Sequence, residues 1–330
     1  KAAEDNPILI DKFINHAMEV DVDAISDGKQ VHVAGIMQHI EEAGIHSGDS
    51  ACSLPPVSIK PFLIKEIENQ TKKLALALKV KGFMNIQFAI KKDEIYVIEV
   101  NPRASRTVPF VSKAKGLPFA KIASRVMAGE KLSKFNLKDK SNGMFAVKEA
   151  VFPFNKFPNS DLLLGPEMKS TGEVMGYDKD FGMAFAKSQI ASSNFLPTKG
   201  LAFLSVKNSH KEEVIDLAKK LKKIGFTLSG TKGTAETLRK NGIKCKTINK
   251  VSSGKPHIVD VLNSKKISLV INTGGGNSET RISDAKALRR ATLINKVPYC
   301  TNMSTAYACI KGIEALRSKK LKVSSLQEKN

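Results

Sequence analysis

The feature that most constrains the fold of this chain is a regular alternation of strand-like and helix-like segments between residues 201 and 301. Short apolar, β-branched runs predict strands, and segments with apolar residues at a helical period predict the helices between them. The strands are predicted at 201–206, 226–229, 244–248, 267–271 and 299–301, and the helices at 211–224, 234–241, 257–263 and 284–295. This alternation indicates a mostly parallel sheet with helices on both faces.

Residues 1–200 have a different pattern, in which strand-like segments follow one another closely. Strands are predicted at 17–25, 30–36, 84–90, 94–101 and 144–152, and helices at 58–80 and 119–128. The first strand places Glu19, Asp21 and Asp23 on one face. The segments 39–50 and 154–158 are predicted to be loops, and a Ser/Asn/Pro/Thr-rich segment at 192–199 predicts a boundary. The first part is therefore expected to be an antiparallel α+β unit.

The hairpin at 84–101 brings polar groups together. A side-chain period of two puts Ile95, Val97, Glu99 and Asn101 on one face of the second strand. A three-residue loop at 92–94 would set a residue of the first strand, Gln87, directly opposite Glu99. We therefore predict that a carboxylate and two carboxamides share one patch of the sheet.

These groups have the chemistry of a magnesium–phosphate site. Mg²⁺ takes oxygen ligands and is usually held by one or two carboxylates together with water and phosphate, which Gln87, Glu99 and Asn101 fit. Pro102 ends the strand, so Arg103 and Arg106 fall in a loop where their forked donors can hold phosphoryl oxygens. A strand end with a surface salt-bridge cluster is the alternative.

A second candidate site lies at one edge of the predicted parallel sheet. The sequence Thr231-Lys232-Gly233-Thr234 follows a strand and opens a helix, so hydroxyls and free backbone N–H groups converge on an anion there. Ligands of open α/β sheets bind beyond the carboxyl ends of the strands. Lys211, Lys250 and Asn272 are predicted at the same edge. Ordinary helix N-capping by Thr231 or Thr234 is the alternative.

Composition narrows the class of protein. The 330 residues contain no apolar run of 18 or more and no signal-peptide pattern, which favours a cytoplasmic protein. Four cysteines without CxxC spacing are expected to be reduced and mostly buried. Of the net charge of +21, residues 201–330 hold most, with 26 Lys and Arg against 9 Asp and Glu. The lysines at 219–223 are interpreted as a solvated helix face rather than a nucleic-acid patch.

Several blocks of this sequence resemble the C-terminal part of the large subunit of carbamoyl-phosphate synthase. The blocks are EVDVDA at 19–24, EEAGIHSGDS at 41–50, Gln87, EVNPRASRTVPF at 99–110 and PFNKF at 153–157. The resemblance implies the C-terminal half of an ATP-grasp domain followed by a Rossmann-like, methylglyoxal-synthase-like domain. The implied division is 1–110 for the ATP-grasp part, 111–196 for the remainder of the second synthetase unit and 197–330 for the regulatory domain. The first residue is Lys, and we expect the chain to be a piece of a longer protein, inactive alone.

The resemblance implies a ligase that uses ATP to phosphorylate carbamate to carbamoyl phosphate in pyrimidine and arginine biosynthesis. Arg103 and Arg106 would stabilise the transferring phosphoryl group. Mg²⁺ or Mn²⁺ would be held by Gln87, Glu99 and Asn101, with K⁺ as a further ion. The residues implied to bind the nucleotide are Glu19, Gly44, Ile45, His46, Ser47, Gln87 and Glu99.

The resemblance also implies allosteric sites and partners. Ornithine would bind Glu41, Asp49, Glu149 and Thr301. A nucleotide monophosphate, UMP or IMP, would bind Lys211, Thr231, Thr234, Lys250 and Asn272. The glycine-rich segment 273–278 departs from the bacterial pattern, because no arginine follows it directly, and this leaves the nucleotide's identity open.

The implied macromolecular partners are the glutaminase small subunit and the N-terminal part of the large subunit, in an oligomer, with no specific nucleic acid and no membrane. Two alternatives remain: another ATP-grasp carboxylate ligase, such as a biotin carboxylase, and a stand-alone anion-binding module.

Overall fold

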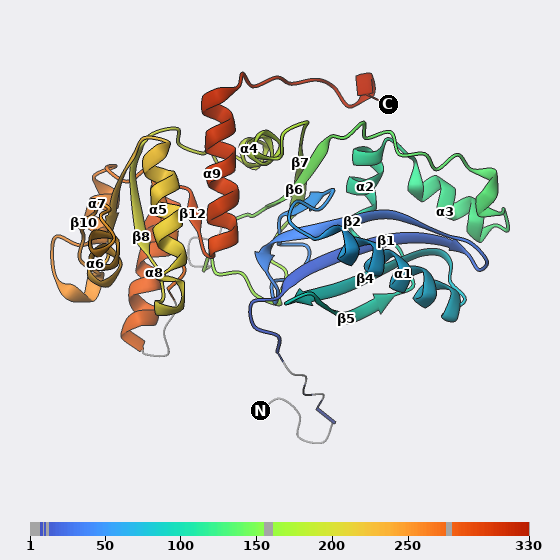
Figure 1. The fold of residues 1–330 in the computed structure, drawn as a ribbon, viewed down its shortest axis with the longest axis horizontal. Coiled ribbons are helices and arrows are strands. Elements are labelled where there is room, and N and C mark those ends of the chain that lie inside the picture. The colour runs from blue at the N-terminus through green and yellow to red at the C-terminus, as the bar shows by residue number, and fades with distance from the viewer. Residues whose placement is uncertain (1–6, 9, 11–12, 155–160, 275–278, 330) are drawn as a thin grey trace.

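A computed structural model describes residues 7–8, 10, 13–154, 161–274 and 279–329, and these form two sheets (Figure 1). The first has seven antiparallel strands in the order β5-β4-β1-β2-β3-β6-β7, and the second has five parallel strands in the order β10-β9-β8-β11-β12. Both predicted classes, antiparallel α+β followed by parallel α/β, are confirmed.

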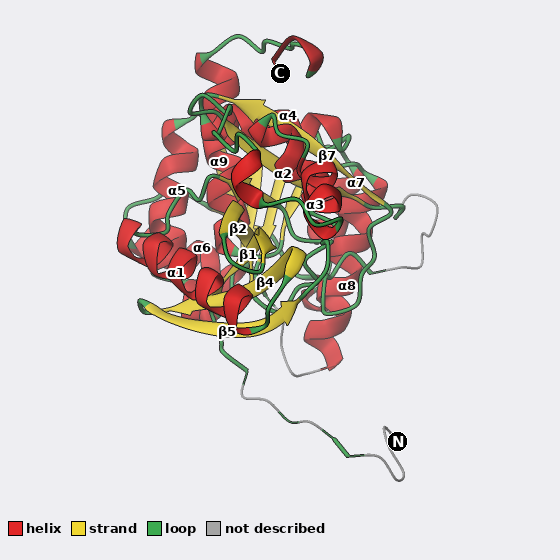
Figure 2. Ribbon diagram, turned by 90° about the vertical axis from the view of Figure 1, so that its right-hand side faces the viewer, coloured by secondary structure: helices red, strands yellow, loops and turns green. Residues whose placement is uncertain are grey.

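The antiparallel sheet is built from seven strands along the first 178 residues. Its strands are β1 (Met18–Asp27), β2 (Val31–Glu42), β3 (Cys52–Leu54), β4 (Lys81–Lys91), β5 (Glu94–Asn101), β6 (Phe145–Val151) and β7 (Gly172–Asp178). Helix α1 (Pro61–Ala77) packs on one face through Leu63 and Ile67, against Val20, Val22 and Phe88. Helices α2 (Val108–Lys115) and α3 (Phe119–Met127) pack on the other face, around Ile25 and Phe83. In Figure 2, β5 forms the lower border of this sheet.

Several boundaries differ from the sequence prediction, and two of the differences are in the antiparallel part near the predicted site. Strand β2 continues to Glu42, so His39 and Glu41 lie in the sheet and not in the predicted loop. Pairing with β1, in which Met18 lies opposite Glu42, holds this extension. Helix α1 is shorter than predicted and ends before Leu78, whose exposed fraction is 54%.

The predicted register of the β4–β5 hairpin is confirmed, but the predicted route to it is wrong. Gln87 pairs with Glu99. The connection is a two-residue turn at Lys92 and Asp93, which have φ values of 48° and 69°, and not a three-residue loop. A bulge beside Gln87 then shifts the register by one residue and restores the pair.

The bulge also changes which side chains share a face. Ile95 pairs with Ile90 and Val97 pairs with Phe88, and both partners belong to the core beneath α1. Glu99 lies on the opposite face with Gln87. The prediction that Ile95 and Val97 share a face with Glu99 and Asn101 is therefore wrong, because a period of two cannot reveal an inserted residue.

The parallel sheet confirms the predicted alternation. Its strands are β8 (Gly200–Ser205), β9 (Phe226–Gly230), β10 (Lys246–Thr247), β11 (Leu269–Asn272) and β12 (Tyr299–Cys300), and its helices are α5 (Glu213–Lys223), α6 (Lys232–Lys240), α7 (Ile258–Asn263), α8 (Glu279–Ile294) and α9 (Met303–Ser318). Helices α7 and α8 pack around Phe203 and Val270, and α5, α6 and α9 pack around Leu204 and Leu228. Helix α5 buries Val214 and Leu217 and exposes lysines, as predicted for a solvated face.

One hydrophobic core joins the two sheets. It includes Val147 of β6, Phe185 of α4 (Phe181–Ala191), Leu204 of β8 and Ile310 of α9. Helices α4 and α9 approach closely because Gly182 lies against the backbone of α9, where a Cβ would be 2.3 Å from the carbonyl oxygen of Lys311. Figure 1 shows α9 between the two sheets. Helices α2, α4 and α9 and strand β7 were not predicted from the sequence.

We expect Gly176→Ala to lower the midpoint of thermal unfolding by several degrees. A Cβ at Gly176 in β7 would lie 1.9 Å from the carbonyl oxygen of Ala184 in α4. Overpacking costs about 1–3 kcal/mol even where side chains can adjust, and backbone atoms adjust less. Gly172→Ala, in the same strand, is the matched control because no atom lies within 4 Å of its added Cβ. Equal midpoints for the two variants would refute this account of β7–α4 packing.

Candidate functional site

Three carboxylates of β1 lie on the sheet face away from α1. Glu19, Asp21 and Asp23 are 5%, 2% and 0% exposed. Their alternate spacing directs them to one face, and the intervening Val20 and Val22 fill the core beneath α1. Burying a charge is costly unless it is paired or hydrogen-bonded, so the surroundings of these groups define the site.

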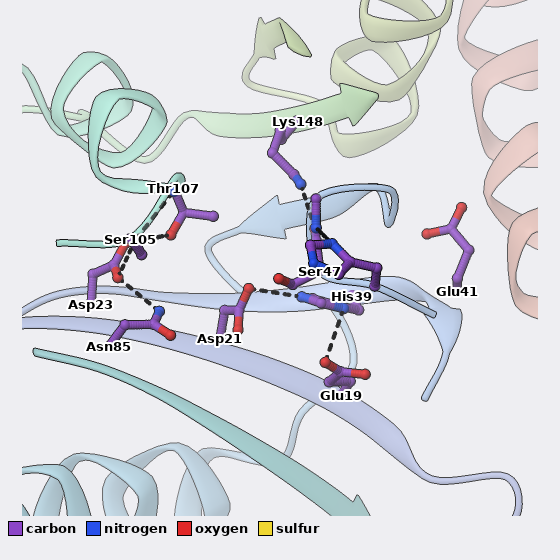
Figure 3. A network of polar contacts seen from close by, with 12 residues as sticks. Glu19, Asp21, Asp23, His39, Glu41, Ser47, Asn85, Ser105, Thr107 and Lys148 are labelled. Carbon is purple, nitrogen blue, oxygen red and sulfur yellow. Dashed lines mark hydrogen bonds and ion pairs between the residues drawn. The ribbon is translucent and has the colours of Figure 1, made fainter. Parts of the chain in front are cut away.

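Asp23 is held by hydroxyl and amide donors. Its Oδ1 accepts hydrogen bonds from Asn85 Nδ2 at 2.9 Å and Ser105 Oγ at 2.7 Å, and its Oδ2 accepts one from Thr107 Oγ1 at 2.5 Å. Burial raises the pKa of Asp23 to about 6, against the lowering effect of these donors. Asp23 therefore anchors the loop that carries the two arginines to the floor of the sheet (Figure 3).

His39 joins the other two carboxylates. Its Nε2 lies 3.1 Å from Asp21 Oδ2, and its Nδ1 lies 3.9 Å from Glu19 Oε1 (Figure 3). Burial alone would lower the pKa of His39, but Asp21 and Glu19 outweigh it and raise the pKa. The raised pKa favours the protonated form of His39, which compensates the two buried carboxylates. His39 was not predicted as a site residue, because residues 39–50 were assigned to a loop.

The side chains predicted to supply oxygen ligands for a metal form a row next to β1. Across the sheet, Glu99 pairs with Gln87 and Gln87 pairs with Asp21, so the three lie side by side on one face. Asn101 Nδ2 donates to Glu99 Oε1 at 2.8 Å. The pKa of Glu19 is raised by burial first, and also by Asp21 and Glu99. The carboxylates of Glu19, Asp21 and Glu99 repel one another, and a divalent cation bound by these and the carboxamide oxygens would relieve the repulsion.

The loop after β2 borders this row. Gly44 has a φ of 102°. Its backbone N–H donates a hydrogen bond to Glu19, which partly opposes the rise in the pKa of that carboxyl. His46 N donates to Gly165 O at 2.8 Å, and the carbonyl of Ser47 accepts a hydrogen bond from Lys148 Nζ at 2.9 Å. Lys148, which is 1% exposed, is a positioning group that the sequence analysis missed. The loop is therefore fixed from two sides.

The two predicted arginines have exposed side chains, and only Arg106 is placed beside this loop by its contacts. The Arg106 guanidinium contacts the sulfur of Met168, and a Cβ on Gly48 would lie 3.0 Å from the same sulfur. Arg103 Nη1 donates to Ala104 O at 3.1 Å. The structure thus brings Arg106 next to the loop 43–50, while Arg103 stays at the surface.

The four residues implied to bind ornithine have different surroundings. Glu41 and Glu149 interact: burial and then Glu41 raise the pKa of Glu149 to about 8, and burial raises the pKa of Glu41. Asp49 is committed elsewhere, because its carboxylate accepts from the backbone N–H groups of Lys169 at 2.8 Å and Ser170 at 2.9 Å. Thr301 follows Cys300, whose Sγ lies 3.4 Å from Cys309 Sγ. The hydrogen bond with Cys300 and burial raise the pKa of Cys309 first, and Glu149 and Glu41 raise it further.

A cavity of about 660 Å³ opens at the carboxyl edge of the parallel sheet. Its lining includes four predicted residues, Lys211, Thr231, Lys250 and Asn272. The fifth, Thr234, is fully buried, and its Oγ1 accepts a hydrogen bond from Lys211 Nζ at 2.7 Å. Thr231 is the N-cap residue of α6 but makes no side-chain capping bond, so the capping alternative is wrong for Thr231. Burial and then Lys250 lower the pKa of Lys211, as expected for two lysines facing one anion site.

A chain of contacts connects this cavity with the antiparallel part. Asn272 Nδ2 donates to Tyr299 Oη at 3.0 Å, and Arg289 binds Asp161 through Nε at 2.5 Å and Nη2 at 2.6 Å. Burial raises the pKa of Tyr299 to about 12, against opposing hydrogen bonds from Asn272 and Arg289. The segment beginning at Asp161 includes Gly165, the partner of His46. The predicted turn residues at 155–158 and the glycine-rich residues 275–278 lie outside the described part of the chain.

The remaining expectations concern cysteines and membranes. Cys52, Cys245, Cys300 and Cys309 are free and buried, as predicted. Within the described residues, no helix combines the length and apolar character needed to cross a membrane.

Comparisons with known proteins show the same resemblance to carbamoyl-phosphate synthase that the sequence blocks indicate. Residues 1–135 match the family described as carbamoyl-phosphate synthase L chain, ATP binding domain, and residues 213–301 match the MGS-like domain family. The carbamoyl phosphate synthase large chain of Rhizobium meliloti (strain 1021) is 54% identical over 98% of this chain and 28% of that protein. The large chain, C-terminal section, of Aquifex aeolicus (strain VF5) is 46% identical over 99% of this chain and 64% of that protein. The chain thus spans only part of these relatives.

Among solved structures, a biotin carboxylase domain of a single-chain bacterial carboxylase is similar with a TM-score of 0.45 and 15% identity, over 55% of this chain and 48% of that one. A similarity at this level supports no argument about function.

We expect the stability of this protein, relative to Glu149→Gln, to decrease as pH rises from about 5 to about 8. The folded-state pKa of Glu149 is raised from 4.5 to about 8, so its stabilising contribution is complete below pH 4.5 and is lost as pH passes about 8. Glutamine stays neutral and can still accept the hydrogen bond from Gln189 Nε2. Urea unfolding midpoints across this range measure the difference. Glu173→Gln, at an exposed position of β7, is the control, and a wild type that tracks Glu149→Gln at every pH would contradict the assignment.

Proposed function

The chain corresponds to the C-terminal section of carbamoyl phosphate synthase large chains, with an ATP-grasp ATP-binding domain followed by an MGS-like domain, and from this we propose a role in phosphorylating carbamate with ATP. The observation that carries the proposal is the row Asp21, Gln87 and Glu99 beside the arginine loop. This row places oxygen ligands for a cation next to guanidinium donors for phosphate.

In the proposed site, Gln87, Glu99 and Asn101 hold Mg²⁺ or Mn²⁺. The bound ion supplies charge neutralisation for the nucleotide phosphates. Glu99 is the exposed carboxylate of the set and reaches outward, whereas Asp21 lies buried below it. Arg106 would hold phosphoryl oxygens from the side of Met168, with Arg103 closing over the substrate. Phosphoryl transfer requires positioning and electrostatic stabilisation more than a covalent nucleophile, which suits these residues.

We assign the nucleotide contacts to Glu19 and the loop residues Gly44, Ile45, His46 and Ser47. The support is geometric. The Gly44 N–H donates a hydrogen bond to Glu19. Hydrogen bonds with Gly165 and Lys148 fix the backbone at His46 and Ser47, respectively. A loop held in this way presents backbone groups at fixed positions, which is useful for recognising a base or ribose. His39 and Asp23 position this surface and do not contact substrate.

The longer relatives suggest how the chain operates. They extend well beyond the matched section, so we propose that catalysis requires the rest of a large chain and a glutaminase subunit. We assign residues 1–110 and 111–196 to the synthetase unit and 197–330 to the regulatory domain, in a cytoplasmic enzyme. A stand-alone regulatory module is disfavoured by the single core that joins Val147, Phe185 and Leu204.

We further propose two effector sites. The interacting acids Glu41 and Glu149, with Thr301 nearby, suit a cationic amino acid such as ornithine, because a ligand ammonium can replace a bound proton. Asp49 would shape this site by fixing Lys169 and Ser170. The 660 Å³ cavity, with Lys211 and Lys250, suits a nucleotide monophosphate such as UMP or IMP, and Thr234 would orient Lys211.

The contacts of Arg289 provide a physical route between the cavity and the catalytic part. An effector that binds Asn272 alters the partner of Tyr299, and Arg289 lies between Tyr299 and Asp161. Asp161 begins the segment that contacts the loop at His46. Coupling requires a difference in these contacts between the effector-bound and free states.

We expect Glu99→Gln in the full-length enzyme to abolish nearly all ATP formation from ADP and carbamoyl phosphate. The substitution keeps the shape but removes the charge that binds the divalent ion, so the loss should exceed about 100-fold. Glu94→Gln, on the same strand at an exposed position, is the matched control and should retain activity. Retention of most activity by Glu99→Gln would exclude Glu99 as a metal ligand.

We expect Arg289→Gln to uncouple the nucleotide effector from catalysis without preventing its binding. UMP or IMP should still raise the thermal midpoint, because Arg289 is outside the cavity lining, but should no longer change the rate of carbamoyl phosphate synthesis. Arg290→Gln, at an exposed neighbouring position on α8, is the control and should respond normally. If neither nucleotide raises the thermal midpoint of the wild type, the effector assignment is wrong. A normal rate response in Arg289→Gln would exclude only the proposed route through Arg289.

A further inference from the structure

Two histidines and a glutamate meet where the antiparallel and parallel parts join. His16 precedes β1, Glu42 ends β2, and His210 ends the short 3₁₀ helix η2 (Asn208–His210) of the second part. One ligand atom from each residue lies within 4.8 Å of the other two. These residues are outside both sites described above, and neither catalysis nor effector binding accounts for their convergence.

The spacing is close to that of a metal centre. Two donors bound to a tetrahedral Zn²⁺ at about 2.0–2.1 Å lie about 3.3–3.4 Å apart. His16 Nδ1 and Glu42 Oε2 are 3.4 Å apart, and the rings of His16 and His210 meet edge to face with centroids 6.0 Å apart. The ligand atom of His210 lies within 4.8 Å of both, so donors from three separate segments converge on one small space.

His210 is also held as metal-binding histidines usually are. Its Nδ1 lies 2.9 Å from Thr273 Oγ1, which leaves Nε2 for a metal. A hydrogen bond at the other ring nitrogen fixes the orientation of a metal-bound imidazole. The ring is buried, with 7% exposure.

A second carboxylate lies beside the three proposed ligands, because Glu213 of α5 faces the same cavity as Glu42. His16, Glu42, His210 and Glu213 all line a cavity of about 800 Å³, which has room for a water molecule to complete four-coordination. His16 itself has a φ of 56°, a left-handed conformation that is uncommon outside glycine.

We propose that His16, Glu42 and His210 form a Zn²⁺ site that fastens the antiparallel part to the parallel domain. Imidazole with one carboxylate suits Zn²⁺, whereas Mg²⁺ prefers oxygen ligands alone, so the two metal sites of this chain are chemically distinct. Because Lys211 follows His210 directly, the ion would also fix the backbone beside the anion cavity. Without metal, the exposed ion pair of His16 and Glu42 contributes little to holding the parts together.

The test is titration of the metal-free full-length protein with Co²⁺ and then Zn²⁺, with excess Mg²⁺ present to occupy the oxygen-ligand site. We expect one equivalent of Co²⁺ to give the visible absorption of a tetrahedral nitrogen–oxygen centre, and Zn²⁺ to displace it. His16→Gln and His210→Gln should each weaken Zn²⁺ binding by more than about 100-fold, and Thr273→Val by about 10–100-fold through loss of the outer hydrogen bond.

His257→Asn is the matched control. His257 caps α7 through its ring nitrogen, and asparagine keeps this role, so Zn²⁺ affinity should be unchanged. Zn²⁺ should also slow backbone hydrogen exchange at 207–211 in the wild type but not in His16→Gln, whose substitution lies in the other part of the molecule. Absence of a stoichiometric tetrahedral Co²⁺ spectrum, or equal Zn²⁺ affinity in wild type and both histidine variants, would overturn the proposal.

Discussion

The structure depends on the burial of three carboxylates along one face of β1. Glu19, Asp21 and Asp23 cannot be buried without compensation, and their partners come from distant parts of the chain. Asp23 requires Asn85 of β4 and the hydroxyls of Ser105 and Thr107, and Asp21 requires His39 of β2. Pairing the buried carboxylates of β1 therefore fixes the loop that carries Arg103 and Arg106, and the end of β2, on the same face of the sheet. One electrostatic constraint thus assembles the candidate site.

A second constraint is close backbone packing at the junction of the two sheets. Gly176 and Gly182 let α4 lie against β7 and α9, and a methyl group at either position would overlap a carbonyl oxygen. The core on both sides of this contact is continuous, from Val147 to Ile310. Movement at the 660 Å³ cavity of the parallel domain is therefore not isolated from the antiparallel part, which supports the proposed regulatory role of this domain.

Local patterns were enough to predict the alternating strands and helices of the parallel domain as far as β12, because each of these elements has its own period, but helix α9 was missed. They also identified Gln87 opposite Glu99, although the actual turn is shorter and a bulge compensates. Long-range pairing is what the patterns missed. His39 is in a strand because the end of β2 pairs with neighbouring strands, and His39 itself lies opposite Cys52 of β3. Helix α4 is buried on nearly every side, so it lacks the polar stripe that identifies a helix. The Arg289–Asp161 pair joins residues 128 apart, beyond any local signal.

The end of β2 is where these features converge. His39 contacts the carboxylates of the proposed nucleotide face, Glu41 interacts with Glu149, and Glu42 reaches His16. Glu42 lies beyond an irregularity in the β1–β2 register and lines the same cavity as His39 and Glu41. In the proposed sites, a cation at Glu41 and Glu149 would remove the repulsion between these two acids, and a metal at Glu42 would fix the end of the same strand. Both act on the strand whose His39 neutralises Asp21, so charge at the junction is linked through a single strand to the floor of the proposed catalytic site.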